Sequence, residues 1–231
     1  MNLTNTQIRT KARRLLDDNV FGKDWIKSAI LSTLVLAIFA GIIGGSIYLS
    51  VTFIAPFLAS VITDASILFA ANILLVILNV LVVFIPLGPV MVGMSAVHLD
   101  LVSGTGSIKI RRFFNGFTEV VDNFQIGFMY ALHIIVWGCL FIIPGIMVGY
   151  SYSMAFYVKR ENPDYTWREC FDESERIMEG NRWKLFKLHC NFVGWYIVGI
   201  LAFLGVGLLW VAPYVSVSTA VFYEEAKNSK D

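Results

Sequence analysis

The chain has 231 residues, of which 57% are apolar and 15% are charged, and its formal net charge at pH 7 is +1. A typical soluble domain is roughly a quarter charged, so a soluble protein of this length could not cover its surface with so few polar side chains. The composition therefore excludes an ordinary soluble domain and predicts an all-α, polytopic helical membrane protein whose surface is mostly solvated by lipid.

The N-terminal segment, residues 1–27, is basic. Within it, Ile8, Ala12 and Leu15 recur on one helical stripe, which predicts an amphipathic helix lying on the membrane face. A solvated basic tail that only sets the orientation of the chain fits the same residues. The apolar run that follows covers residues 28–63, which is far longer than the roughly 7–15 residues of a signal-peptide core, so we interpret it as a retained transmembrane helix.

A first hairpin is expected in the long apolar stretch that follows, where Asp64 is the single charge. We expect a first helix over residues 25–50 and a second over residues 71–101. An interfacial connection over residues 51–70, broken at Pro56, would join them. The stretch is longer than two crossings of about 20 residues need, so four short crossings are the alternative, and the placement of Asp64 decides between them.

A second hairpin is expected over residues 123–158, which contain no Asp, Glu, Lys or Arg. The stretch is too long for one crossing and suits two short ones, so we predict a turn near Pro144 and Gly145, just past its middle. The polar segment before it, residues 102–122, has apolar side chains at helical spacing and predicts an amphipathic surface helix. These side chains are Phe113, Phe117, Val120 and Phe124.

Residues 159–187 form the longest charged segment, with seven basic and seven acidic residues. Thr166 and Glu169 have the spacing of a capping box, which predicts a helix start. The near balance of charge is typical of a solvated helix face rather than a nucleic-acid patch, so we expect no nucleic-acid partner and a possible docking face for a protein. The side chains expected on the inner face of this helix are Trp167, Phe171, Ser174 and Met178.

A third hairpin is expected over residues 188–223, turning at Gly205 to Gly207, and a polar tail follows it. The 18 Lys and Arg residues lie in four segments: six in residues 1–27, three in 99–122, seven in 159–187 and two in 224–231. Positively charged loops stay cytoplasmic, so we expect six crossings with both termini in the cytoplasm. The chain would then be one transmembrane domain of three hairpin units: residues 1–101, 102–158 and 159–231.

Proline and glycine mark expected kinks and close contacts between helices. Prolines inside membrane helices free backbone carbonyl groups, and such breaks line the sites of some transporters. The expected kinks are at Pro86, Pro89 and Pro213. Glycines four residues apart let helices approach closely, and we favour packing within the chain over a dimer seam, which leaves the oligomeric state open. The two pairs are Gly41 with Gly45 and Gly145 with Gly149.

Short motifs in the last hundred residues follow a characteristic order. They are Pro-Gly-Ile at 144–146, Tyr-x-Met at 152–154, Glu-Asn-Pro at 161–163, Ser-x-x-x-Met-x-Gly at 174–180, Leu-Phe-x-Leu at 185–188, Gly-Trp at 194–195, Leu-Trp at 209–210 and Pro-Tyr…Ala-x-Phe-Tyr at 213–223. This series resembles the bacterial integral-membrane family known as domain of unknown function 975, over residues 124–223. Residues 1–123 fit it only loosely, and Cys190 and Asn191 stand where the family usually has a serine. The resemblance implies a multi-pass membrane protein, mostly of Gram-positive bacteria, and no reaction.

Three polar side chains inside predicted spans are candidate ligand-binding residues. Asn72 and Asn79 lie seven residues apart on one helix face, where they either line a polar cavity or bond neighbouring helices together. His133 lies in the middle of a span, where a titratable group is unusual and suggests proton or ligand handling. The alternative is that its ring is simply satisfied within the bundle.

Nothing in the sequence predicts a metal, a cofactor or a catalytic centre. His98 and His189 lie near the inner membrane edge, and no cysteine or carboxylate has ligand spacing to them. The cysteines, Cys139, Cys170 and Cys190, are an odd number without CxxC spacing, so we expect free thiols. Nucleophile-elbow, Walker and His-Glu-x-x-His motifs are absent from the sequence.

Three functions remain open on the sequence alone. We favour a non-enzymatic scaffold or accessory protein in envelope upkeep or self-protection, with membrane lipid around it and a protein partner on residues 159–187. The alternative is a small transporter, or the membrane subunit of one, with a site between hairpins near Asn79 and His133. An intramembrane enzyme of unrecognised type is the third hypothesis.

Overall fold

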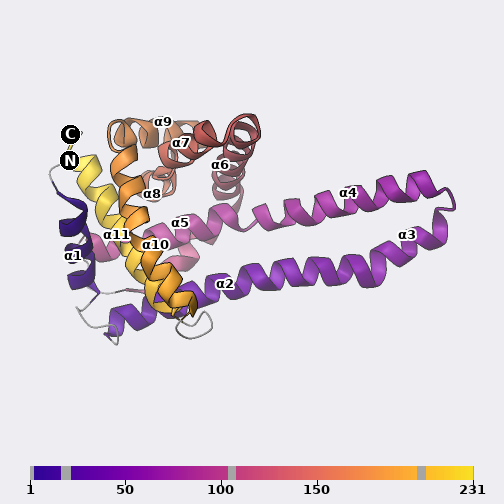
Figure 1. Ribbon diagram of the computed structural model, residues 1–231, viewed down its shortest axis with the longest axis horizontal. Helices are drawn as coiled ribbons and strands as arrows, with labels where there is room; N and C mark the ends of the chain where they lie inside the picture. Colours follow the sequence, from indigo (N-terminus) through magenta and orange to yellow (C-terminus); the bar gives the residue numbers. More distant parts are fainter. Residues whose placement is uncertain (1–2, 17–21, 104–107, 202–206, 231) are drawn as a thin grey trace.

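The computed structural model describes residues 3–16, 22–103, 108–201 and 207–230, and within these ranges every regular element is a helix. The predicted all-α class is therefore confirmed. Figure 1 shows a body of packed helices from which a long arm of two antiparallel segments extends. Two helices are long and apolar enough to cross a membrane, judged by length and composition alone: Lys23–Val61 and Val120–Leu140.

The arm is a helical hairpin that turns at residues 62–64. Asp64 caps the returning helix, because its carboxylate accepts hydrogen bonds from the backbone N–H groups of Ser66 and Ile67 at 2.9 and 3.0 Å. The outgoing side is continuous helix, with a π-helical turn in its middle. The elements of the arm are α2 (Lys23–Leu49), η1 (Ser50–Ile54), α3 (Ala55–Val61) and α4 (Ala65–Phe84).

The predicted break at Pro56, within the connection over residues 51–70, is wrong. Pro56 lies in the first turn of α3, directly after the π-helical turn η1. Proline lacks an N–H, and the π-helical turn before it already departs from the usual hydrogen-bond pattern, since the N–H of Ala55 bonds to the oxygen of Ser50. The helix therefore runs through the proline to Val61, and the chain reverses at Asp64 instead.

Most of the arm does not touch the body. The buried side chains of α2 end at Ser32, and partly buried ones that pack on the core end at Phe39. On the returning side, the buried residues begin at Pro86, directly before α5 (Leu87–Val102). Each free side is thus about 22 residues, or roughly 33 Å at a rise of 1.5 Å per residue. This length is close to the roughly 30 Å of a bilayer core.

The body is assembled around α5 through contacts that only glycine allows. A methyl group on Gly88 would lie 1.6 Å from the backbone oxygen of Asn123, and one on Gly93 would lie 2.3 Å from that of Phe113. Asn123 also donates from Nδ2 to the backbone oxygen of Gly116 at 2.8 Å. The two elements that these contacts bring against α5 are η2 (Ile110–Phe117), a 3₁₀ helix, and α6 (Val120–Leu140).

The second hairpin turns earlier than predicted. The turn near Pro144 and Gly145 is wrong, because α6 ends at Leu140 and the extended residue Phe141 starts the return. Gly145 packs against α6, where a methyl group would lie 2.7 Å from the Cα atom of Gly138. The chain must reverse before this contact, and Pro144 fits the first turn of the returning helix. The return is broken into α7 (Ile142–Ser151) and α8 (Ala155–Glu161).

The remaining helices close the body at the end opposite the arm (Figure 1). The predicted N-terminal amphipathic helix is present, but Ile8 and Ala12 are buried within the protein rather than lying on a membrane face. The Arg9 guanidinium stacks over the ring of Phe192, 5.2 Å from its centroid. The turn expected at Gly205 lies outside the described residues. These helices are α1 (Asn5–Leu15), α9 (Trp167–Met178), α10 (Arg182–Leu201) and α11 (Leu208–Asn228).

Replacing Gly88 by alanine tests the contact at the centre of the body. We expect Gly88→Ala to lower the free energy of unfolding by about 1–3 kcal/mol, because the methyl group overlaps the Asn123 carbonyl and the backbones must separate. The measurement is thermal unfolding of the purified protein in detergent. The matched control is Gly44→Ala on the free arm, where no atom lies within 4 Å and the change should be neutral or slightly stabilising. Equal effects at both positions would contradict the close contact.

Candidate functional site

A buried lysine organises the polar side of the body. The Lys159 side chain is only 4% exposed, and its Nζ atom lies 3.9 Å from Oε2 of Glu119. Nζ also donates to the backbone oxygen of Tyr165 at 3.0 Å and to that of Pro163. Burying an ammonium group is costly unless its donors are paired. Lys159 therefore fixes the loop that joins α8 to α9.

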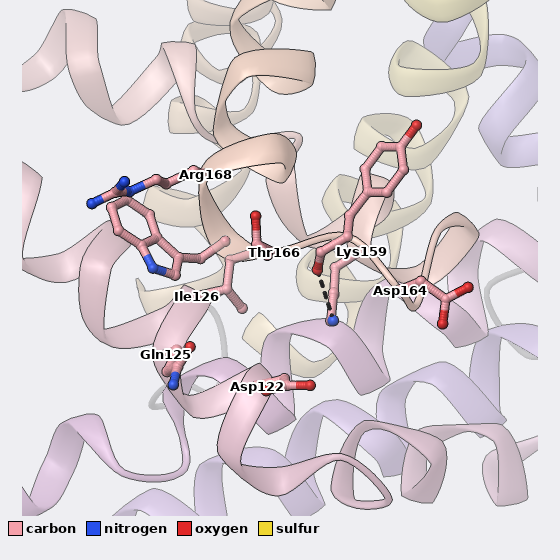
Figure 2. Close-up of a pocket in the computed structure, with 9 residues that line it drawn as sticks. Asp122, Gln125, Ile126, Lys159, Asp164, Thr166 and Arg168 are labelled. Atoms are coloured by element: carbon pink, nitrogen blue, oxygen red, sulfur yellow. Dashed lines mark hydrogen bonds between the residues drawn. The ribbon is translucent and has the colours of Figure 1, made fainter.

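A polar cavity of about 430 Å³ opens beside this lysine. Figure 2 shows Asp122 and Gln125 of α6 below it, with Lys159 and Thr166 above. Arg168 completes the lining, with its guanidinium 5.0 Å from the ring centroid of Trp167. The cavity is thus lined by positively and negatively charged side chains and by both hydrogen-bond donors and acceptors. The arrangement can hold a polar or charged group, and it presents no pair of nucleophile and base.

The helix that forms the upper wall, α9, begins with the predicted capping box. Thr166 N donates to Oε2 of Glu169 at 2.7 Å, and Glu169 N donates to Oγ1 of Thr166 at 3.4 Å. These hydrogen bonds favour the ionised carboxylate and lower the pKa of Glu169 below its ordinary value of 4.5. Burial raises the pKa of the nearby Cys170 thiol to about 11, so it stays protonated at neutral pH and is a poor nucleophile.

Ser174 attaches the inner face of α9 to the break between α7 and α8. Its fully buried hydroxyl donates to the backbone oxygen of Ser151 at 2.7 Å and accepts from the backbone N–H of Met154 at 3.1 Å. One side chain thereby pairs two backbone groups that the interrupted helix leaves free. Phe171 and Met178, which the sequence placed on the same face, are buried as well.

Two carboxylates join helices that are distant in the sequence. Asp100 of α5 forms two ion pairs. Its Oδ2 atom lies 3.0 Å from Nε of Arg112 in η2, and its Oδ1 atom lies 3.4 Å from Nη2 of Arg160 in α8. Glu161 of α8 pairs with Lys227 of α11 at 2.8 Å and accepts a hydrogen bond from the Tyr223 hydroxyl. Each carboxylate is partly shielded from water, so these pairs are screened less than fully exposed ones.

The two candidate asparagines lie on the arm. Asn79 donates from Nδ2 to the Ser50 hydroxyl at 2.7 Å across the hairpin, and Asn72 donates to the backbone oxygen of Leu68 at 2.8 Å in its own helix. Both line a cleft of about 460 Å³ between α2, η1 and α4, whose walls are otherwise largely apolar. Oδ1 of Asn79 is buried without a hydrogen-bond partner.

His133 lies elsewhere, in an aromatic cluster. Its ring makes edge-to-face contacts with Tyr152 and Phe171 and a tilted contact with Trp167. Nδ1 lies 2.7 Å from the backbone oxygen of Met129, one turn back in α6. His133 is not among the residues that line the cleft of the asparagines, so the structure does not bring the three candidates together.

The prolines predicted as kinks have different positions. Pro86 separates α4 from α5 as the N-cap of α5, and Pro89 lies in the first turn of that helix. Pro213 lies inside α11. Next to it, the backbone oxygen of Trp210 accepts a hydrogen bond from Nε1 of Trp25 at 3.1 Å. The indole thus pairs with a backbone carbonyl in the turn where proline interrupts the helix.

The predicted glycine pairs differ from each other. Gly145 packs directly on α6, and a methyl group on Gly149 would make an ordinary contact with Ile134 at 3.5 Å. Gly41 and Gly45 lie on the free arm, where no atom comes within 4 Å of such a methyl group. Packing within the chain, which we favoured for both pairs, therefore holds for the second pair and is wrong for the first.

Sequence reasoning missed the contacts that join polar groups across helices. Lys159, Asp100 and Glu161 were read only as parts of charged segments. The signal that could have found Lys159 is its position, directly after a charge-free span and four residues before a proline. No such signal pointed to the buried contact between Ser28 and His98, in which the Ser28 hydroxyl lies 3.0 Å from Nε2 of the histidine. Among the described residues, no three His, Cys, Asp or Glu side chains converge on a possible metal position.

Comparison with known proteins gives one family match and no named relative. The model of the family described as "Protein of unknown function (DUF975)" matches residues 69–230. The match begins in α4, well before residue 124, where the resemblance stated from the sequence begins. No curated protein and no solved structure matches the chain.

Removing the Ser174 hydroxyl tests how α9 is held. We expect Ser174→Ala to lower the free energy of unfolding by about 1–3 kcal/mol, because the Ser151 carbonyl and the Met154 N–H are left buried and unpaired. Ser60→Ala is the control, since the exposed Ser60 hydroxyl bonds only to its own helix. Thermal unfolding in detergent compares the two. Equal unfolding temperatures would show that the hydroxyl does not anchor α9.

The capping box predicts a pH-dependent contribution from Glu169. The pKa of this carboxyl is lowered in the folded protein, so its contribution to stability is complete above the ordinary value of 4.5 and is lost as the pH falls through the lowered pKa. We expect Glu169→Gln to unfold at a lower temperature than the wild type at pH 7, with a smaller difference at pH 3. Asp172→Asn, on the exposed face of α9, controls for the change in net charge. A difference that does not shrink with falling pH would contradict the prediction.

Proposed function

The chain belongs to the family described as "Protein of unknown function (DUF975)", and on that premise we propose that it is a non-enzymatic membrane scaffold. In this proposal it crosses the bacterial cell membrane six times, in three hairpins, with both termini in the cytoplasm. The hairpins are α2–α3 with α4–α5, α6 with α7–α8, and α10 with α11. Their polar ends carry a platform, formed by α9, on which a protein partner docks.

Apolar surface supports the membrane placement. The two helices that are long and apolar enough to cross a membrane lie in different hairpins. The free sides of the arm have about the length of a bilayer core and contain no charge before the turn at Asp64. At the turn of the second hairpin, Phe141 and Ile142 are 68% and 76% exposed. Lipid would cover such surfaces at no cost, whereas water would not.

Contacts between the four basic segments support a common cytoplasmic face. Their pairing brings together segments that the sequence separates widely, as a shared side of the membrane requires. Residues 1–27 and 224–231 meet through Lys11 and Glu225, and residues 99–122 and 159–187 meet at Asp100. Residues 159–187 and 224–231 meet through Glu161 and Lys227.

The observation that carries the scaffold proposal is that one face of α9 is buried against the bundle while the opposite face is exposed. Its inner face is fixed to the bundle by Ser174 and the buried apolar side chains around it. Its outer face is exposed and carries charges of both signs. A rigid, exposed and charged helix with no reaction chemistry beside it is suited to recognising a protein surface. The charged residues of this face are Arg168, Glu169, Asp172, Glu175, Arg176 and Glu179.

The transport hypothesis gains no comparable support. It required a polar site between hairpins, and Asn72 and Asn79 line a cleft within the arm while His133 packs in an aromatic cluster at α9. We therefore propose Asn79 as a contact between the two sides of the arm, Asn72 as a side chain paired within its own helix, and His133 as a packing residue.

Photocrosslinking from α9 tests the docking platform. With a photoreactive amino acid in place of Asp172 or Arg176, we expect a discrete crosslinked protein in irradiated cells, because these positions face outward on the fixed helix. The same substitution at Ile197, an exposed apolar position on α10, serves as the matched control and should yield no protein adduct. Absence of an adduct from both α9 positions would contradict the scaffold proposal.

Cysteine labelling tests the threading separately. In a variant without native cysteines, Asp64→Cys should react with an impermeant maleimide added to intact cells, since the proposal places the arm's turn outside. Ser229→Cys should react only after the cells are permeabilised. Labelling of Ser229→Cys in intact cells would overturn the proposed orientation, whatever the crosslinking shows.

A further inference from the structure

A groove lies between α7 and α10 on the side of the body formed by the second and third hairpins. Two cavities, of about 620 and 420 Å³, share Ile146, Tyr150 and Phe186 as lining residues and therefore lie side by side. We call these two adjoining spaces together the α7–α10 groove. Each volume falls within the range of sites that hold small molecules.

The floor of the groove is made of glycine. Gly138, Gly145 and Gly149 all line it. Because Gly145 lies directly on the backbone of Gly138, α6 and α7 meet without side chains between them, and a smooth channel remains above the contact. A methyl group on Gly149 would make only an ordinary contact at 3.5 Å, so this position can take a side chain without moving the backbone.

The walls of the groove are apolar and open to the surroundings. Ile143 and Met147 of α7 are 73% and 50% exposed, although both line the space. Such an opening in an aqueous protein would be costly, at roughly 25 cal/mol for each Å² of apolar surface. In a membrane, a hydrocarbon chain is the natural occupant of a smooth apolar channel of this kind.

One end of the groove is cationic. Arg182, the first residue of α10, lines the space beside Trp183. One guanidinium nitrogen, Nη2, donates to Oε1 of Glu175 at 2.8 Å, while the buried Nε has no hydrogen-bond partner. Lys187 adds a second positive charge, with Nζ 5.6 Å from the ring centroid of Trp183. Glu175 offsets one of these two positive charges, and the remaining positive charge at this end complements an anion.

A polar side chain stands between the cationic end and the glycine floor. Tyr150 lines both cavities, and its hydroxyl lies 3.4 Å from Nδ1 of His189. Nε2 of the same histidine lies 3.4 Å from the Thr219 hydroxyl. These contacts are longer than strong hydrogen bonds. Because Tyr150 lines both cavities, its hydroxyl can exchange this long hydrogen bond for one to an acceptor in the groove, such as an ester carbonyl.

We propose that the α7–α10 groove binds one anionic phospholipid. Its phosphate lies against Arg182, its glycerol ester group lies at Tyr150, and one acyl chain runs over the glycine floor. The order of cation, hydroxyl and apolar channel along the groove matches the order of groups along such a lipid. A zwitterionic choline lipid fits less well, because its quaternary ammonium would meet Lys187. The inference needs the open side of the groove to face lipid, but it needs neither the six crossings nor the docking of a protein on α9 proposed above.

Native mass spectrometry of the purified protein in detergent tests this site. With phosphatidylglycerol and phosphatidylcholine of matched chains at equal concentration, the wild type should retain one phosphatidylglycerol. Arg182→Gln should weaken this binding about tenfold or more, the scale expected for one charge-assisted hydrogen bond. Gly149→Leu should weaken it similarly, because the side chain fills the channel.

Matched variants separate the site from general effects. Arg176→Gln removes a charge outside the groove, and Gly194→Leu adds the same side chain at an open position of α10, so both should bind as the wild type does. Thermal unfolding confirms that each variant is folded. Equal retention of both lipids by the wild type, or undiminished binding by Arg182→Gln, would overturn the proposal. Displacement of the lipid by inorganic phosphate alone would also overturn it, because the acyl chain would then contribute nothing.

Discussion

Two carboxylates at the polar end of the bundle hold the rest of the structure in place. Asp100 and Glu161 each pair with positive groups from other helices, and between them they connect α5, η2, α8 and α11. An exposed ion pair contributes little by itself, but a network of partly shielded pairs fixes which helix ends lie together. Once these ends are joined, the apolar parts of the helices have few other ways to pack.

In the apolar part of the body, close contacts at glycine residues fix how the helices pack. Gly88, Gly93 and Gly145 each lie against another backbone with no room for a methyl group. Packing between membrane helices gains nothing from the hydrophobic effect within lipid, so close van der Waals contact has to supply the association energy. The same contacts fix α6 and α7 so closely that a smooth channel is left outside them. Stability and the proposed lipid site thus have a common structural origin.

Local signals in the sequence predicted local structure well and long-range contacts poorly. The capping box at Thr166 and Glu169 is present as predicted, because both partners lie within one helical turn. The break at Pro56 and the turn near Pro144 were misplaced, because proline can be accommodated near the start of a helix as well as at a break, and only packing decides between them. The role of Lys159 could not be read from its neighbours alone, since its burial depends on how α6, α8 and α9 meet. The distance between the asparagines and His133 likewise depends on the arrangement of whole helices.

The free arm has a fixed length, set by the Asp64 cap at its tip and by the body at its base. A rigid hairpin of this kind cannot adapt to bilayers of different thickness by stretching. If the arm spans the membrane as proposed, it has to tilt in a thinner membrane, and in a thicker one the lipid around it has to compress, each at a modest cost in free energy per ångström. Through this hydrophobic mismatch, the arm would favour regions of membrane whose thickness equals its own length, independently of any partner on the opposite end of the molecule.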